Sequence, residues 1–407
     1  MPRVLARRLV LLCVLAVPSR SAFAQQDIPD PAADAKIRLG PLALTPTLAL
    51  VNAGIDTNVF NEPTQAAPKR DFTMTFQPKA DWWLRMGRTW LLGNVSEGLV
   101  YYNRYASERS TSGLYKAGWL VPLARFTFQA GGSYLTTRDR PGFEIDARSR
   151  RTELGGDGNL EIRAFSKTFM GIKGKWQKVS YDDAAVFLGE NLHVQLNRTV
   201  TSGAVTFRHQ ITPLTSVTFD VGREQARFEF SPLRDADSTQ IVAGVKFDPF
   251  ALLKGSATVG YRDFEPLTPG VPSYRGSTAA IDLAYVALTS TKISVRGLRD
   301  VQYSYDVNQP YYLETGITGE LMQQLFGPVD VVGRVGIARL DYRDRVGASV
   351  PVANRLDTMH IYGGGVGYRV GKEIRIGFNV DQQKRDSHVP LQQYEGLRYG
   401  TSVTYGF

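Results

Sequence analysis

Alternating apolar and polar residues fill the chain from residue 42 to its end, in segments joined by connections that are short and long in turn. Period-two alternation is typical of a β-strand with one apolar and one polar face. Eight connections are turn-like, as at 86–88, and nine are longer and polar, as at 139–148. Barrels that span the bacterial outer membrane have short periplasmic turns, longer external loops and an even strand number. The sequence therefore predicts an all-β, transmembrane, antiparallel up-and-down β-barrel of about 18 strands, with 16 as the alternative.

The expected strands have approximate bounds, and two of them contain irregularities. An apparent change of face near residues 200–205, and another near Ala338, indicate β-bulges. The strands are expected at 42–54, 71–86, 88–104, 111–121, 124–138, 150–164, 168–180, 191–208, 213–229, 238–248, 253–264, 275–288, 291–304, 311–324, 328–342, 355–370, 373–384 and 395–407.

The last strand has an apolar and aromatic face and ends the chain on an aromatic residue. Its apolar positions resemble the C-terminal signal that the barrel-assembly machinery of the bacterial outer membrane recognises. The last strand of a soluble β-sandwich is the alternative interpretation of these residues alone. The expected signal residues are Leu397, Tyr399, Val403, Tyr405 and Phe407.

The first residues have the pattern of a secretory signal peptide. A basic stretch with Arg7 and Arg8 precedes the apolar run 9–17, and Ala22 and Ala24 form an Ala-x-Ala cleavage site. We therefore expect a signal peptide at 1–24, a periplasmic tail at 25–40 and an outer-membrane barrel at 41–407. The only cysteine lies inside the expected signal peptide, so the exported chain would have neither a disulfide nor a thiolate metal site.

Charge and hydropathy narrow the class of protein further. The formal charge of +9 includes four arginines before residue 25, which leaves 9 − 4 = +5 for the exported chain. That excess is too diffuse to predict a nucleic-acid partner. No later stretch has 18 continuous apolar residues, whereas 11% aromatic residues and 39 glycines suit alternating barrel strands. We expect the protein in the outer membrane of a Gram-negative-type bacterium, in contact with its lipid.

Aromatic residues gather near the expected strand ends, where girdles of membrane barrels lie. A random placement in a soluble core is the alternative. The external girdle would contain Tyr101, Tyr181, Phe228, Tyr261, Tyr303, Tyr311 and Tyr342.

Positions that alternate with the apolar face would line the lumen, and more of them are basic than acidic. A net basic lumen would favour anionic solutes or acidic polymers. The alternative is that these charges pair into ladders that stiffen the wall. Loops 56–70 or 265–274 would narrow the pore if they folded inward. The expected basic residues are Arg163, Lys173, Lys175, Lys254, Arg262, Arg296, Arg334, Arg375 and Arg398, and the expected acidic ones are Glu161, Asp220, Asp282, Asp330 and Asp381.

The start of the barrel region resembles the β-barrel porin type 2 family. The resemblance is carried by the segment with Pro46 and Leu48, followed by the Gly-x-Asp-x-Asn-Val-Phe stretch at 54–60. It implies a single-domain outer-membrane barrel. Some members of the family occur with exopolysaccharide production genes, so the resemblance also implies a role in polysaccharide export, with export components as partners. The carboxylate of Asp56 and the amide of Asn58 favour an Asx turn over a Ca²⁺ site.

The sequence predicts no catalytic residue, cofactor or metal site. The four histidines are scattered without a zinc-binding spacing, and Ser133 lacks the Gly-x-Ser-x-Gly pattern. The glycine-rich run 363–367 indicates close packing or curvature of a strand. Three functions stay open: a channel for anions or acidic exopolysaccharide, an occluded barrel for surface interaction, and, as the weakest, an enzyme acting on lipid or glycan. The sequence does not decide between a monomer and an oligomer.

Overall fold

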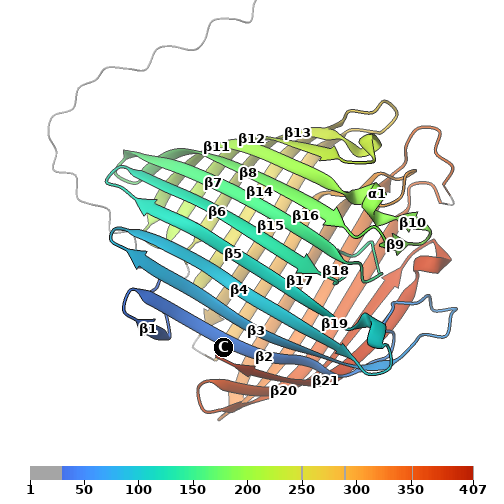
Figure 1. Ribbon diagram of the computed structural model, residues 1–407, viewed down its shortest axis with the longest axis horizontal. Coiled ribbons are helices and arrows are strands. Elements are labelled where there is room, and N and C mark those ends of the chain that lie inside the picture. The colour runs from blue at the N-terminus through green and yellow to red at the C-terminus, as the bar shows by residue number, and fades with distance from the viewer. Residues whose placement is uncertain (1–29, 249–250, 288–289, 351, 407) are drawn as a thin grey trace, which may run out of the picture.

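The computed structural model describes residues 30–248, 251–287, 290–350 and 352–406. The chain forms a closed antiparallel β-barrel of 18 strands, as predicted (Figure 1). The strands are β2 (Leu42–Asp56), β3 (Asp71–Met86), β4 (Thr89–Tyr102), β5 (Ser110–Pro122), β6 (Phe126–Thr137), β7 (Arg151–Phe165), β8 (Thr168–Tyr181), β11 (Arg198–Thr212), β12 (Thr215–Phe228), β13 (Ala236–Phe247), β14 (Leu253–Pro266), β15 (Tyr274–Ala287), β16 (Thr291–Tyr303), β17 (Tyr311–Phe326), β18 (Val329–Arg343), β19 (Leu356–Val370), β20 (Ile374–Asp386) and β21 (Tyr394–Tyr405).

Small elements decorate the barrel. Strand β1 (Ile37–Leu39) pairs with the start of β2, and β9 (Val186–Phe187) pairs with β10 (Glu190–Asn191). Helix α1 (Leu192–Leu196) follows β10, and 3₁₀ turns occupy 106–108, 232–234 and 390–392. No helix in the described ranges is long and apolar enough to cross a membrane. The expected signal peptide, with Ala22 and Ala24, and the terminal Phe407 lie outside the described residues.

Each barrel strand pairs with its neighbour in sequence, and the first pairs with the last. The closing contact joins β2 to β21, with Leu48 opposite Tyr405 and Asp56 opposite Arg398. The short turns lie at one end of the barrel and the long loops at the other (Figure 1). Closure leaves no free strand edge, which is the condition for a sheet to span a hydrocarbon layer.

Side-chain alternation separates an apolar outer face from a polar inner face. On β12, Phe219 and Val221 are exposed on the outside, whereas Thr218 and Asp220 line a cavity inside. The described apolar residues of the expected assembly signal, Leu397, Tyr399, Val403 and Tyr405, are likewise exposed. A lipid layer would accept this outer face, and water would accept the inner one.

The prediction of two β-bulges from the sequence is wrong. The apparent changes of face arise because the inner face of the barrel becomes apolar at the loop end. No register shift occurs at 200–205 or at Ala338. Val200 instead packs against an inward apolar cluster, and Ala338, Leu340 and Tyr342 form part of another. The strand expected from residue 191 begins only at Arg198, since residues 192–196 form α1.

The expected external aromatic girdle is wrong for several of its members. Tyr181, Phe228, Tyr311 and Tyr342 are at most 7% exposed and belong to three buried clusters at the loop end of the barrel. Burying one such side chain contributes about 2 kcal/mol. These rings therefore stabilise the three apolar clusters at the loop end of the barrel, and they do not contact lipid.

Two prolines lie within strands where their missing N–H groups cost little. Pro46 on β2 precedes Leu48, where pairing with β21 begins, so no strand lies on that side of it. Pro78 on β3 falls where the ladder to β4 skips from Phe76 to Lys79. Proline is tolerated at such edges and interruptions.

Candidate functional site: the lumen and the loop that crosses it

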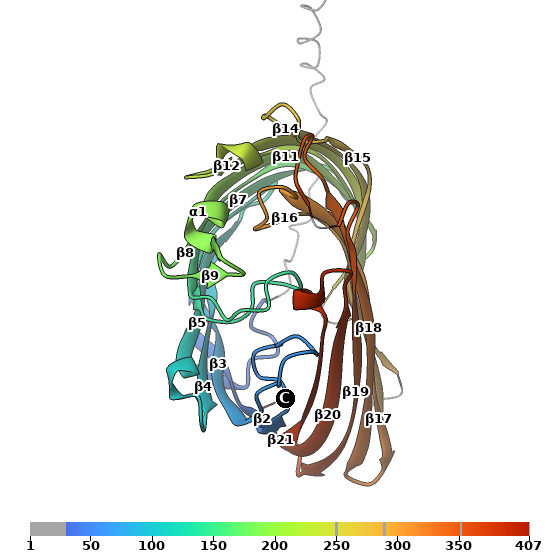
Figure 2. The ribbon, with the colours of Figure 1, turned by 90° about the vertical axis from the view of Figure 1, so that its right-hand side faces the viewer.

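The connection between β6 and β7, residues 138–150, crosses the external mouth and is called here the crossing loop. It runs from the wall that contains β6 and β7 to the opposite wall near the 3₁₀ turn 390–392 (Figure 2). Glu144, Ile145 and Asp146 at its tip are at most 7% exposed. Ile145 packs in the cluster with Tyr181 and Phe228, which anchors the loop by apolar contact.

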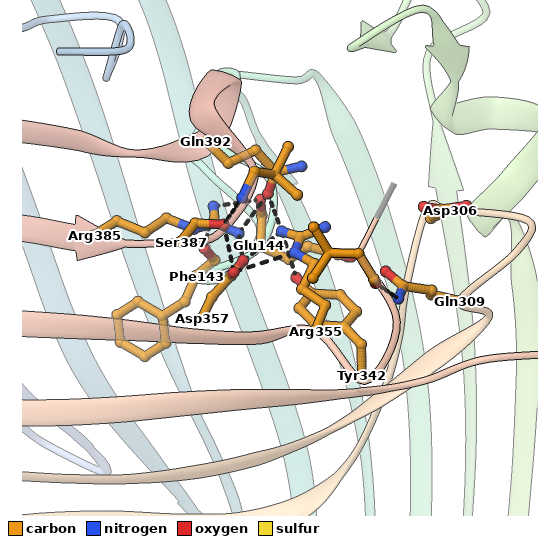
Figure 3. A network of polar contacts seen from close by, with 12 residues as sticks. Phe143, Glu144, Asp306, Gln309, Tyr342, Arg355, Asp357, Arg385, Ser387 and Gln392 are labelled. Carbon is orange, nitrogen blue, oxygen red and sulfur yellow. Dashed lines mark hydrogen bonds and ion pairs between the residues drawn. The ribbon is translucent and has the colours of Figure 1, made fainter. Parts of the chain in front are cut away.

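A buried ion network on the far wall holds the tip of the crossing loop. Arg385 Nη1 donates to Asp146 Oδ2 at 2.7 Å and to the carbonyl oxygens of residues 143 and 144. Its Nη2 donates to Asp357 Oδ2 at 2.6 Å and to Gln392 Oε1 at 2.7 Å, and Arg355 bonds to the same two partners (Figure 3). Removing one member of such a network would leave an uncompensated buried charge.

The tip of the β16–β17 hairpin forms a second anchor. Ser304 Oγ donates to Glu144 Oε1 at 2.5 Å, and the Tyr305 N–H donates to Glu144 Oε2 at 3.3 Å. The buried guanidinium of Arg234 donates in turn to the carbonyl oxygens of residues 304 and 305. Burial raises the pKa of Glu144 to about 7, against the opposing effects of the Ser304 hydroxyl and of Arg355 and Arg385.

Loop 56–70, one of the two loops that would narrow the pore if folded inward, contacts the crossing loop. Arg140 Nη2 donates to the carbonyl oxygen of Val59 at 2.8 Å, and Asn61 Nδ2 donates to Asp146 Oδ1 at 3.2 Å. The Asn58 N–H donates to Asp56 Oδ1, which is the expected Asx turn. The Asp56 carboxylate therefore fixes the turn at the start of loop 56–70.

Loop 265–274, the other loop that would narrow the pore if folded inward, contacts its neighbours at the barrel rim. Pro272 O accepts from Tyr311 Oη, and the Val346 N–H donates to Gly270 O. The inward course of the crossing loop was not predicted from the sequence, although the loop carries Phe143 and Ile145 between polar residues. Those two side chains, together with the apolar inner strand ends, are the signals that indicate an inward loop.

Three cavities of the lumen are lined by charged side chains. The first, of about 930 Å³, lies against β6–β8 and β11–β14 and is called here the neutral cavity. Its lining includes five basic and five acidic residues, and because Arg223 lies on the outward face of β12 with Phe219 and Val221, the charges that face the lumen nearly balance. The basic and acidic lining residues are Lys173, Lys175, Arg208, Arg223, Lys246, Asp157, Glu161, Asp220, Glu224 and Asp248.

The second cavity, of about 810 Å³, lies mainly against β16–β21 and β2 and is called here the basic cavity. Its lining includes five basic residues but only two acidic ones. They are Lys292, Arg334, Arg369, Arg375, Arg398, Glu320 and Asp381. When Asp330 and Asp56, the buried partners of Arg375 and Arg398, are counted as well, five basic residues face four acidic ones, an excess of one positive charge.

Ion pairs hold the arginines of the basic cavity against the wall. Arg334 contacts Glu320 at 2.8 Å and Asp381 at 2.7 Å, and Arg375 contacts the buried Asp330 at 2.6 Å. Both expected arrangements thus occur together, since the same arginines line a cavity and form ladders. A fixed guanidinium presents its charge without first losing conformational freedom.

The third cavity, of about 480 Å³, lies between the crossing loop and β2–β6 and is called here the outer cavity. Arg140, Arg148 and Arg398 contribute basic groups to its lining, and Asp139 contributes an acidic one. Hydroxyl and amide side chains of the barrel wall, together with the apolar Val100, Leu114 and Leu135, line the rest of it.

The remaining expected lumen residues have different surroundings. Arg262 is buried between Glu224 at 2.6 Å and Asp300 at 3.0 Å. The guanidinium of Arg163 lies 5.8 Å from the Phe169 ring centroid. Lys254 and Arg296 share the inner face by register but line none of the three cavities. A role of any of the nine in solute selectivity stays a prediction.

The acidic lumen residues are mostly engaged with bases. Glu161 contacts Arg208 at 2.6 Å and Asp220 contacts Lys173 at 2.7 Å. Asp282 is 3.9 Å from Arg296, and both side chains are about four-fifths exposed to the lumen. Within the described ranges, no group of three His, Cys, Asp or Glu residues could hold a metal ion.

The sequence profile of one family, described as "Putative beta-barrel porin 2", matches residues 30–407. The chain belongs to this family. The match covers the whole described barrel and confirms the resemblance found at residues 46–60. The β-barrel porin 2 family is described by its porin character and not by an enzymatic activity.

Solved outer-membrane barrels resemble the β-barrel porin 2 chain at low identity. A BenF-like porin from Pseudomonas fluorescens Pf-5 has 12% identity and a TM-score of 0.46, with 90% of this chain and 98% of that chain covered. OccK1 (OpdK) from Pseudomonas aeruginosa has 10% identity and a TM-score of 0.46, with 89% and 98% covered. A comparison with curated proteins gives no significant match. These values say nothing about a solute.

Proposed function

We propose that this porin-family barrel is an outer-membrane channel that passes small anionic solutes beside the crossing loop. The observation that carries the proposal is the composition of the basic cavity, whose lining has five basic residues and two acidic ones. A net positive wall of low dielectric constant raises the local concentration of anions and excludes cations. The neutral cavity, in which both signs nearly balance, would add space without selectivity.

Small anions suit the lumen better than an acidic exopolysaccharide strand. A sugar polymer would meet the crossing loop, whose tip is buried against the far wall by Arg385 and Ser304. A small carboxylate or phosphate ion could pass through the outer and basic cavities with the loop in place. Export of exopolysaccharide, with export components as partners, stays a prediction from the family resemblance.

Single-channel recording in planar bilayers tests the proposal. Refolded protein from Gln25 to Phe407 should give stepwise currents, with chloride more permeant than potassium in a KCl gradient. Lys292 is an exposed residue of the basic cavity without an ion pair in the described ranges, so Lys292→Gln should lower that preference. Lys175→Gln, in the neutral cavity, is the matched control and should change the preference less.

Two outcomes would overturn the proposal. A folded barrel that passes no current would favour the occluded barrel that acts in surface interaction. Single-channel currents that are carried mainly by potassium would show that the barrel is a channel, but would contradict an anionic solute. Folding is verified separately by the heat-dependent shift of the barrel in gel electrophoresis.

A further inference from the structure

A bulge in β2 turns one side chain into the lumen. The ladder of β2 shifts between Leu50 and Ala53 against β21, and between Val51 and Gly54 against β3. Asn52 lies inside both shifts with a φ of +54°. A residue other than glycine seldom adopts this conformation, and asparagine tolerates it best. Bulges commonly redirect a side chain next to a functional site.

The bulge residue lies where two cavities meet. Asn52 and Arg398 are the two residues that line both the outer and the basic cavity. The outer cavity reaches Arg140 and Arg148 of the crossing loop, and the basic cavity reaches Lys292 beside a short turn. These two cavities therefore follow one side of the lumen from the external mouth to the periplasmic end.

Close backbone approach keeps this junction free of bulky side chains. Gly54 of β2 is paired with Gly400 of β21, next to the bulge. A Cβ atom on Gly400 would lie 2.9 Å from the carbonyl oxygen of Ala53, so a larger residue does not fit. Gly400 itself lines the basic cavity.

The guanidinium at the junction is held on one side and free on the other. Arg398 Nε and Nη2 donate to Asp56 Oδ2 at 3.1 and 2.6 Å, and Asp56 is 6% exposed. The Arg398 side chain is still 38% exposed, and its Nη1 makes no hydrogen bond within the described residues. The Asn52 side-chain amide is likewise without a partner in the described ranges. The junction thus has N–H donors available to an oxyanion.

We propose that Asn52 and Arg398 form the anion-binding waist of the channel, which takes one small carboxylate or phosphate ion at a time. The Arg398 Nη1 and the Asn52 amide supply charge-assisted and neutral hydrogen bonds to the oxyanion, while Asp56 fixes the orientation of the guanidinium. This inference rests on the proposed anion channel and adds its selectivity-determining residues. The other arginines of the basic cavity supply a general field, and the waist supplies direct contact.

Two variants of the full exported chain test the waist by different routes. Arg398→Gln removes the charge, and Asn52→Gly removes the amide while keeping the backbone conformation. Reversal potentials are measured in gradients of KCl, potassium acetate and potassium phosphate. We expect Arg398→Gln to lower the anion-to-cation permeability ratio about tenfold and to abolish saturation of the acetate and phosphate currents. Asn52→Gly should weaken the saturation with a smaller change in the ratio.

Controls separate the waist from folding and from the lumen charge. Arg296→Gln removes a charge that is 80% exposed in the lumen but outside the three cavities, and should leave the saturation unchanged. Arg398→Gln leaves Asp56 without its arginine, so Asp56→Asn/Arg398→Gln is prepared to restore a neutral pair. Asn52→Gly keeps the Asp56 contact and should fold in any case.

The outcomes distinguish the waist from the channel itself. Anion-selective currents that neither Arg398→Gln nor Asn52→Gly changes would overturn the waist and leave the channel standing. A folded wild-type barrel without current would overturn both. If the variants lose saturation of the acetate current but keep that of the phosphate current, the site binds carboxylates only. The reverse result would mean that it binds phosphate only.

Discussion

Glycine at inward positions of β19 determines how far the charged wall of the basic cavity extends into the lumen. A Cβ atom on Gly367 would lie 2.5 Å from Asp330 Oδ1 and would also overlap the Arg375 guanidinium. Gly363 has the same relation to Asp381. The glycine run at 363–367 was interpreted from the sequence as a place of close packing, and that interpretation is confirmed. These glycines let the ion pairs lie flat, which keeps the cavity open.

Gly367→Ala should therefore destabilise the barrel. The added methyl group would displace the Arg375–Asp330 pair from the wall, and overpacking of this kind costs about 1–3 kcal/mol. The free energy of unfolding is measured by urea denaturation in detergent micelles. Gly364→Ala is the matched control on the same strand, because its Cβ meets only Val332 O at an ordinary 3.8 Å. Equal stability of the two variants would contradict the argument.

The crossing loop is the element whose position depends on buried carboxyl groups. Glu144 faces Arg355, Arg385, Arg234 and the hydroxyl of Ser304. Burial raises the pKa of Glu144 to about 7 from 4.5, and it also raises the pKa of Asp146, which Arg385 opposes. A raised carboxyl pKa means that the docked loop prefers the protonated group. Docking is therefore tightest below about pH 4.5 and weakens as the pH rises to about 7.

Single-channel conductance should accordingly rise between about pH 4.5 and 7 and then level off. The docking equilibrium weakens by one to about two orders of magnitude across that window. Glu144→Gln, which stays neutral, should remove most of the rise and leave the loop docked at neutral pH. Asp139→Asn alters an exposed carboxyl of the same loop and serves as the control. A wild-type conductance that falls with rising pH would contradict the argument that ionisation of Glu144 weakens docking of the crossing loop.

The barrel as a whole could be predicted from sequence because its information is local. Alternation along each segment and the length of each connection determine strand, face and neighbour, so β17 at 311–326 and β18 at 329–343 lie close to their expected bounds. The closing pair of β2 and β21 follows from the even strand number. Nine lumen positions were placed on the inner face for the same reason.

The occupied mouth could not be predicted, because its contacts are distant in sequence. Arg385 and Asp146 are separated by 239 residues, and Ser304 and Glu144 by 160. No local pattern specifies such partners. Apolar residues on the inner face were misinterpreted as signs of bulges or as a lipid-facing girdle, because a water-filled lumen is expected to have polar side chains on its wall. Only the packed loops explain why Leu340 and Tyr342 point inward.

At the scale of the whole molecule, salt should separate the field of the lumen from contact at the waist. Screening shortens the reach of charges from about 10 Å at 0.1 M salt to about 3 Å at 1 M. The excess charge of the basic cavity acts across the lumen, so the chloride preference of the wild type should fall steeply over that range.

The two charge-removing variants should differ in the same measurement. Lys292→Gln should lower the anion preference at 0.1 M and leave the value at 1 M nearly unchanged, because Lys292 acts only through the field. Arg398→Gln should lower both values, because a hydrogen bond to the ion persists within the shorter screening distance. Reversal potentials at a fixed concentration ratio and two mean concentrations give both numbers. If both variants lost their effect at 1 M, the selectivity would belong to the field alone and Arg398 would be one charge among several.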